Sequence, residues 1–219
     1  MIPIMFRYSI ENAVHDLKEL VHFLQLDKFH LLGHSFGGIV AYEYLAAGMH
    51  QGSGDCLSLT LASTPSNMKT SLEECSRLEE EVKSELMLED NIEVEEATRL
   101  VQDELRRRNE CRLEEMPVSL VTAIEGRGTI FGPEEVADYV AHSPSSIDSF
   151  PSVLMIRGQY DFVTEKCIEG WREIFSQDSK PRGTAYREEE MSNCAHYCHL
   201  EDAQSFGDLI KSHCFINDY

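Results

Sequence analysis

Basic residues are scarce in this sequence. Its 219 residues include 19 Lys and Arg against 39 Asp and Glu, which gives a formal net charge of −20 with histidine neutral. Nucleic acids and anionic membrane surfaces are bound through patches of Lys and Arg. We therefore expect neither nucleic acid nor a membrane among the partners of this protein.

Long apolar stretches are also missing. A membrane-spanning helix requires about 20 consecutive apolar residues. No apolar run in the sequence approaches that length. The apolar start, Met1 to Phe6, is too short for the hydrophobic region of a signal peptide. Hydrophobic residues make up 42% and charged residues 26% of the chain, which is typical of a soluble globular protein and argues against global disorder. The expected location is the cytoplasm.

A disulfide framework is not indicated. The seven cysteines are odd in number and scattered in spacing, so free thiols in a reducing compartment are the simplest interpretation. The segment from Cys194 to His199 holds four side chains that could bind a metal. A structural zinc site normally has a second pair of ligands at a distance, and the sequence shows none. We predict no metal and no other cofactor.

Apolar runs alternate with helical patterns in two parts of the chain. In the first predicted helix, apolar residues recur at spacings of three and four, with Ser9 as the N-cap. Strands that alternate with helices predict an α/β fold with a parallel sheet. The strand before residue 34 is expected to be buried. The predicted strands are residues 28–33, 56–62, 152–157 and 183–188, and the predicted helices are 8–26, 37–47 and 202–215.

Residues 67–146 have a different character. They are charged and helix-rich, contain no convincing strand and separate two predicted strands of the sheet. We therefore predict a helical cap at residues 67–146, inserted into an α/β core of residues 1–66 and 147–219. Nearly all charges of this segment are expected to face solvent. They include three successive arginines from Arg106 and the glutamates Glu73, Glu74, Glu79, Glu80, Glu81 and Glu85.

The segment Gly33-His34-Ser35-Phe36-Gly37 matches the pattern G-x-S-x-G. An apolar strand precedes it and an Ala-rich helix follows it, as in a nucleophile elbow. The sharp turn favours glycine on both sides of the serine, where larger side chains would clash. We predict Ser35 as the nucleophile, with the backbone N–H of Phe36 facing the oxyanion at the helix N-terminus.

A serine hydroxyl needs a base to take its proton, and after such an elbow the acid and then the histidine follow in the chain. Asp161 follows the third predicted strand, whereas Asp148 precedes that strand and is the weaker candidate. His196 lies in a small polar loop and is favoured over His199, which adjoins the last helix. Asp161 and His196 thus complete a predicted catalytic triad. The remaining histidines are expected to be structural or exposed: His15, His22, His30, His34, His50, His142 and His213.

Three segments together resemble the catalytic segments of α/β-hydrolases. They are Gly33-His-Ser-Phe-Gly-Gly38, Arg157-Gly-Gln-Tyr-Asp161 and Cys194-Ala-His-Tyr-Cys-His-Leu-Glu201. Within that superfamily the chain is most similar to the proline iminopeptidases, which are serine aminopeptidases with a helical cap. The resemblance implies an α/β-hydrolase fold and release of an N-terminal residue, preferably proline, from peptide or small-molecule substrates without a cofactor.

The resemblance extends into the predicted cap. The segment Ile130-Phe-Gly-Pro-Glu-Glu135 is similar to the family's asparagine-glycine-proline-x-glutamate segment, whose glutamate binds the free amino terminus of the substrate. The resemblance therefore implies substrate binding by Glu135, with Glu134 as its neighbour. A desolvated carboxylate that pairs with an ammonium would select an unblocked N-terminus. The other interpretation of this pair is surface charge near a helix start.

The chain departs from the family in two ways. Members often carry a second amine-binding glutamate directly after the catalytic aspartate, where this chain has Phe162. The family also has several strands, and a His-Gly-rich oxyanion loop, ahead of the helix that precedes the elbow. Without them the Phe36 N–H would be the single oxyanion donor, and loss of one donor costs about 100- to 1,000-fold in rate. The strand before Ser35 would become an edge strand.

Two alternatives to the aminopeptidase follow from these departures. An esterase or lipase-like hydrolase is favoured by Phe162, which would suit less polar acyl groups, and by the generic elbow. A truncated and catalytically inactive member, or a binding module that uses the cap, is favoured by the absence of the early strands.

Overall fold

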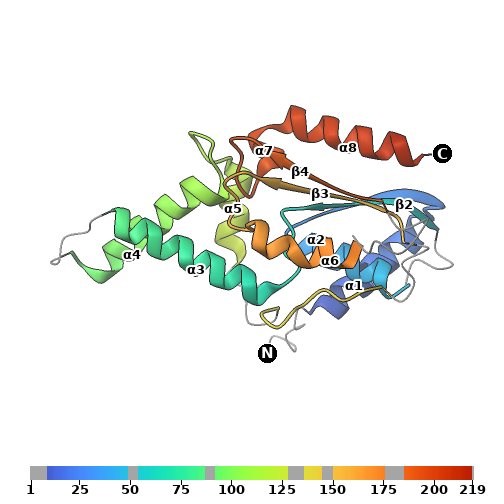
Figure 1. Ribbon diagram of the computed structural model, residues 1–219, viewed down its shortest axis with the longest axis horizontal. Helices are drawn as coiled ribbons and strands as arrows, with labels where there is room; N and C mark the ends of the chain where they lie inside the picture. Colours follow the sequence, from blue (N-terminus) through green and yellow to red (C-terminus); the bar gives the residue numbers. More distant parts are fainter. Residues whose placement is uncertain are drawn as a thin grey trace, which may run out of the picture.

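The core of the protein is a parallel sheet. Figure 1 shows the computed structural model, which describes residues 9–48, 54–86, 92–127, 136–144, 150–175 and 185–218. Four strands pair in parallel in the order β1-β2-β3-β4. They are β1 (Lys28–His34), β2 (Asp55–Ala62), β3 (Ser152–Gly158) and β4 (Tyr186–Met191). The predicted parallel α/β sheet is confirmed, although its last strand ends at Met191 rather than at residue 188.

Helices cover both faces of the sheet, with α1, α2 and α6 on one face and α8 on the other (Figure 1). Their bounds are α1 (Ile10–Phe23), α2 (Phe36–Ala46), α6 (Glu169–Phe175), α7 (Cys198–Glu201) and α8 (Ala203–Asn217), with a 3₁₀ turn, η4, at Glu165–Ile168. The three helices predicted outside the cap are confirmed as α1, α2 and α8. Ser9 caps α1 by accepting a hydrogen bond from the Asn12 N–H at 3.2 Å. Among the described helices, none combines the length and the apolar character needed to cross a membrane.

The two faces of the sheet bury alternate residues of β3. Val153 and Met155 belong to the core cluster beneath α1, α2 and α6, whereas Leu154 and Ile156 belong to the cluster beneath α8. Successive side chains of a strand point to opposite faces. Because both faces are covered, the strand shows as one continuous apolar run in the sequence.

Strand β1 lies at the edge of the four-stranded sheet and, among the described strands, pairs only with β2. Of its residues only Gly33 is buried, and Leu32 is 44% exposed. The prediction of a buried strand is therefore right in position and wrong in burial. The edge placement is the one expected for the strand before Ser35.

The insertion between β2 and β3 is helical. Its elements are α3 (Met68–Glu85), α4 (Val94–Leu105), the π-helix η1 (Arg106–Glu110) and α5 (Val118–Arg127). The two ends of the insertion lie side by side, since Asn67 forms an antiparallel bridge with Val140 and the Ala141 N–H donates to the Ser66 carbonyl at 2.7 Å. The helices extend beyond one end of the sheet (Figure 1). That residues 67–146 act as a separate cap domain stays a prediction.

Glu74 of α3 joins this insertion to the core. The residue is only 6% exposed, and its carboxylate accepts hydrogen bonds from Lys166 at 2.8 Å, Thr164 at 3.0 Å and Arg77 at 3.2 Å. The bond from Lys166, together with those from Arg77 and Thr164, lowers the pKa of Glu74 to about 2, although burial acts in the opposite direction. The expectation that charges of the insertion face solvent is wrong for Glu74.

We expect Glu74→Gln to lower the free energy of unfolding at neutral pH by about 1–3 kcal/mol, because it leaves three donors with a weaker acceptor. The folded-state pKa lies below the ordinary value of 4.5, so the stabilisation is complete above about pH 4.5 and is lost as the pH falls towards 2. Urea unfolding across that range should show a difference between the two proteins that shrinks with falling pH. Glu80→Gln, on the exposed side of the same helix, is the control. A difference that does not change with pH would contradict the prediction.

The cysteines take no part in a disulfide, and all seven are free thiols, as predicted. Cys194 and Cys198 pack into the apolar cluster beneath α8, and burial raises the pKa of the Cys198 thiol to about 12. In the described part of the chain, no group of three or more metal-binding side chains is arranged to hold an ion. At these two positions the thiols fill the core.

Candidate active site

Ser35 occupies a strained turn between β1 and α2. Its backbone lies at φ 54° and ψ −122°, outside the regions that side-chain-bearing residues normally adopt. The Ser35 N–H donates to the Ala62 carbonyl at 2.8 Å, and the Ser35 carbonyl accepts from the Gly38 N–H at 3.0 Å. The sharp strand-to-helix turn that the motif predicts is therefore present. Phe36 is the first residue of α2, which places its N–H at the helix N-terminus.

The glycines around Ser35 differ in how tightly they are enclosed. A Cβ on Gly33 would lie 2.3 Å from the Gly37 carbonyl oxygen, and one on Gly38 would lie 1.9 Å from Thr64 Oγ1. A Cβ on Gly37 would meet nothing within 4 Å. The expectation that both flanks of the serine exclude side chains is right for Gly33 and wrong for Gly37. The close contact on the helix side falls one residue later, at Gly38.

We expect Gly33→Ala to destabilise the protein by about 1–3 kcal/mol, because the methyl group would collide with the backbone of α2. Gly37→Ala is the matched control, since it adds the same methyl group in open space inside a helix and gains up to about 1 kcal/mol of helix propensity. Thermal unfolding of the two variants should therefore shift the melting temperature in opposite directions. Equal shifts would show that crowding at Gly33 is relieved by the surrounding backbone.

Asp161 and His196 meet at the carboxyl ends of two neighbouring strands, although they come from different loops. Asp161 follows β3 and His196 follows β4. The Nδ1 of His196 lies 2.9 Å from Oδ1 of Asp161, and both side chains are almost completely buried. The same Oδ1 accepts the Val163 N–H at 2.8 Å. With Nδ1–H as the donor, Nε2 of His196 is left free to accept a proton.

His34 links the serine turn to the histidine loop. Its Nε2–H donates to the His196 carbonyl at 2.8 Å, and the two imidazole rings are 4.7 Å apart between centroids. Burial, reinforced by the charge of His196, lowers the pKa of His34 to about 3. His34 is therefore neutral around pH 7 and acts as a hydrogen-bond donor, which agrees with the structural role predicted for it.

The described residues include no hydrogen bond between the Ser35 hydroxyl and His196. The two residues are joined indirectly, because His34 precedes Ser35 in the chain and holds the His196 backbone. Hydrogen bonds between a nucleophile and its base are often long without substrate and shorten when substrate binds. The arrangement is therefore compatible with proton transfer from Ser35 to His196.

Phe162 covers one face of the His196 ring. The two rings are stacked, with centroids 4.1 Å apart and planes 27° from parallel. This is the position at which the resembled family often has a second glutamate. An aromatic face against imidazole makes this side of the site apolar, and it would attract the imidazolium that forms during proton transfer.

Three sequence candidates fall outside the described residues. Glu134 and Glu135, the implied amine-binding pair, lie in the gap between residues 127 and 136. Asp148, the weaker candidate for the catalytic acid, lies between residues 144 and 150. His199, the weaker candidate for the base, is described and lies next to His34, with ring centroids 4.8 Å apart.

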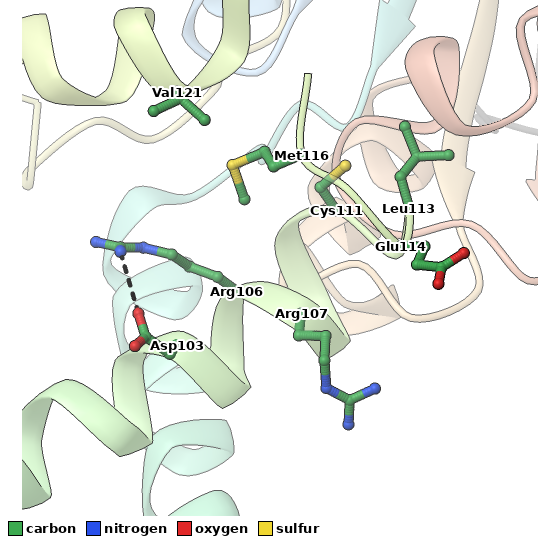
Figure 2. Close-up of a pocket in the computed structure, with 8 residues that line it drawn as sticks. All are labelled: Asp103, Arg106, Arg107, Cys111, Leu113, Glu114, Met116 and Val121. Atoms are coloured by element: carbon green, nitrogen blue, oxygen red, sulfur yellow. Dashed lines mark ion pairs between the residues drawn. The ribbon is translucent and has the colours of Figure 1, made fainter. Parts of the chain in front are cut away.

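One cavity lies within the helical insertion and is drawn in Figure 2. It has a volume of about 320 Å³, and none of the three triad candidates lines it. Figure 2 shows Arg106 paired with Asp103, at 3.6 Å, and Arg107 pointing in another direction. Glu114 and four apolar side chains complete the lining, the apolar ones being Cys111, Leu113, Met116 and Val121.

Asn109 contacts the site, and no pattern in the sequence predicts that contact. Asn109 of η1 donates from Nδ2 to the Tyr160 carbonyl at 2.8 Å, and its own carbonyl accepts from the His196 N–H at 3.3 Å. It follows a run of arginines that looks like a solvated surface. Only the three-dimensional arrangement brings it to the triad candidates.

Comparisons with known proteins support the fold. A family model described as alpha/beta hydrolase fold matches residues 2–203. A Bacillus subtilis (strain 168) protein named "Putative 2-succinyl-6-hydroxy-2,4-cyclohexadiene-1-carboxylate synthase" is 27% identical over 217 residues, covering 94% of this chain and 72% of its own. The proline iminopeptidase of Mycobacterium smegmatis aligns with a TM-score of 0.71 at 17% identity, over 96% of this chain and 73% of that one. The structure of VinJ aligns with a TM-score of 0.73 at 16% identity, over 97% of this chain and 74% of that one.

Proposed function

The chain belongs to the alpha/beta hydrolase fold family, and on that premise we propose that it is a serine hydrolase acting through an acyl-enzyme on Ser35. The observation that carries the proposal is the buried hydrogen bond of 2.9 Å between His196 Nδ1 and Asp161 Oδ1, in a loop that His34 ties to the strained turn of Ser35. That combination provides a nucleophile, a base and a group that orients the base.

The proposed reaction has two steps. Ser35 Oγ attacks the substrate carbonyl carbon while His196 Nε2 takes its proton, and the Phe36 N–H donates to the oxyanion. His196 then gives the proton to the leaving group, and water hydrolyses the acyl-enzyme by the same route in reverse. Asp161 holds the tautomer of His196 and stabilises the imidazolium. No metal or organic cofactor takes part in these steps.

For the substrate we propose a peptide with a free N-terminus, preferably proline. Support comes from the resemblance of the triad segments and of the segment ending at Glu135 to proline iminopeptidases. The similarity of fold to the M. smegmatis enzyme is in agreement. A net charge of −20 would attract a cationic, free-amine substrate. Glu135, with Glu134, would hold the ammonium group.

An ester substrate is the second candidate, and Phe162 is the observation that favours it. The ring of Phe162 stacks on His196 at the place where a second amine-binding carboxylate would stand. An apolar wall at this point suits an uncharged acyl group better than an ammonium.

Parallel assays on free prolyl-nitroanilide, N-blocked prolyl-nitroanilide and a short nitrophenyl ester separate the two candidates. The aminopeptidase proposal predicts preference for the free prolyl substrate and loss of that preference in Glu135→Gln. Equal rates on the free and blocked substrates would contradict a role for Glu135 and favour the esterase.

Labelling by a fluorophosphonate tests the nucleophile independently of substrate choice. A folded protein that never labels would contradict the mechanism and favour the inactive alternative. Labelling without hydrolysis of any of the three substrates would contradict both substrate proposals and leave the nucleophile in place.

A further inference from the structure

The π-helix η1 reaches from the helical insertion to both loops that carry triad candidates. The hydrogen bond from the Cys111 N–H to the Arg106 carbonyl, at 2.9 Å, closes a turn five residues long. Such turns make up well under 1% of protein residues and occur frequently at functional sites. The extra residue turns Asn109 inward, so that it is 9% exposed although three arginines precede it.

Asn109 contacts the two loops through different atoms. Its side chain donates to the carbonyl of Tyr160, the residue directly before Asp161, at 2.8 Å. Its backbone carbonyl accepts from the His196 N–H at 3.3 Å. One buried residue thus touches the loop of the acid and the loop of the base.

The neighbours of Asn109 strengthen the same connection. The Glu110 carbonyl accepts from the Tyr197 N–H at 3.0 Å. The Arg112 N–H donates to Glu201 at 3.0 Å, and the Arg112 guanidinium lies 4.0 Å from the centre of the Tyr160 ring. The segment therefore contacts each loop at more than one point.

The Asp161–His196 bond depends on the relative position of two separate loops. Directly between the loops, the Tyr160 N–H donates to the Cys194 carbonyl at 2.9 Å. We propose that Asn109 is a positioning residue, whose side-chain amide fixes the Asp161 loop against the His196 loop and so sets the geometry of the base. This inference rests on the proposed function. It makes the insertion part of the catalytic machinery rather than only a cover.

The test compares hydrolysis of nitrophenyl acetate by Asn109→Ala, by Asn109→Asp and by the wild-type protein. Both variants lose the donor to Tyr160, and Asn109→Asp keeps the volume of the side chain. We expect kcat to fall by about 10- to 100-fold in both variants, because a small misplacement of reacting groups lowers the reaction rate by up to about 100-fold. KM should stay within about twofold, because the binding surface is unchanged. Labelling of Ser35 by a fluorophosphonate should slow by the same factor as kcat.

Val101→Ala is the matched control, since it removes buried volume from α4, in the same insertion, and a valine side chain forms no hydrogen bond to either loop. It should lower the melting temperature while leaving kcat unchanged. Asn109 variants that keep wild-type kcat, or that lose activity only in proportion to their loss of melting temperature, would overturn the inference.

Hydrogen exchange separates this inference from the proposed function. In Asn109→Ala we expect faster exchange at the amides of Tyr160 and His196, and no change there in Val101→Ala. A wild-type protein that neither labels nor hydrolyses the ester would sink the proposed function, and the exchange data would still decide whether Asn109 holds the loops. Unchanged exchange in Asn109→Ala would overturn the positioning role.

Discussion

Replacing Ser35 with alanine should lower kcat/KM by about 10⁵-fold or more, because it removes the atom that forms the acyl-enzyme. The fold should survive, since alanine differs from serine only by the hydroxyl and the turn at φ 54° is held by backbone hydrogen bonds to Ala62 and Gly38. Two measurements check the prediction: steady-state hydrolysis of a nitrophenyl ester, and the mass of the intact protein after treatment with a fluorophosphonate. The wild-type protein should gain one adduct and Ser35→Ala none.

Ser63 provides a matched control for this experiment. It follows β2, its backbone has a similar φ of 50°, and it is fully buried. Ser63→Ala should keep the adduct and the rate of the wild-type protein. An adduct that persists in Ser35→Ala would show that another side chain is the reactive nucleophile.

Replacing Asp161 with alanine should lower kcat by about 10⁴-fold. The change leaves the Nδ1–H of the buried His196 without its acceptor, so the ring can adopt the wrong tautomer and the imidazolium loses its counter-charge. Asp161→Asn keeps an oxygen that can accept from both His196 and the Val163 N–H while removing the charge. We expect Asp161→Asn to lower kcat by about 10⁴-fold as well, because an uncharged amide neither fixes the tautomer of His196 nor stabilises its imidazolium.

Two controls accompany the Asp161 variants. Asp148→Ala, at the weaker candidate for the acid, should keep wild-type activity; loss of activity there and not at Asp161 would reverse the assignment. Thermal unfolding should be measured as well, because Asp161→Ala also removes the acceptor of the Val163 N–H. If kcat of Asp161→Ala stays within tenfold of the wild-type value, a triad that includes Asp161 is contradicted.

The elements that the sequence predicted best are those whose signals are local. The β3 strand is a continuous apolar run because both of its faces are buried, and Ser9 caps α1 through a bond only three residues long. The elbow at Ser35 was predictable because the steric demand at Gly33 comes from residues four and five positions along the chain. Where the partner is distant, prediction failed: β1 reads as buried but only Gly33 of it is buried, and Glu74 reads as a surface charge but is buried against Lys166.

By itself, the sequence determined the α/β fold and the strand-to-helix turn at Ser35, because periodicity and turn chemistry act between neighbouring residues. It also proposed two partners for Ser35 from their order along the chain, Asp161 and His196. Only the tertiary structure decided that these last two side chains lie 2.9 Å apart in a buried setting, that Phe162 covers the imidazole, and that Asn109 touches both loops. These are contacts between segments far apart in the chain. Their energies depend on burial and on hydrogen-bond geometry at the meeting point, which no local pattern of residues encodes.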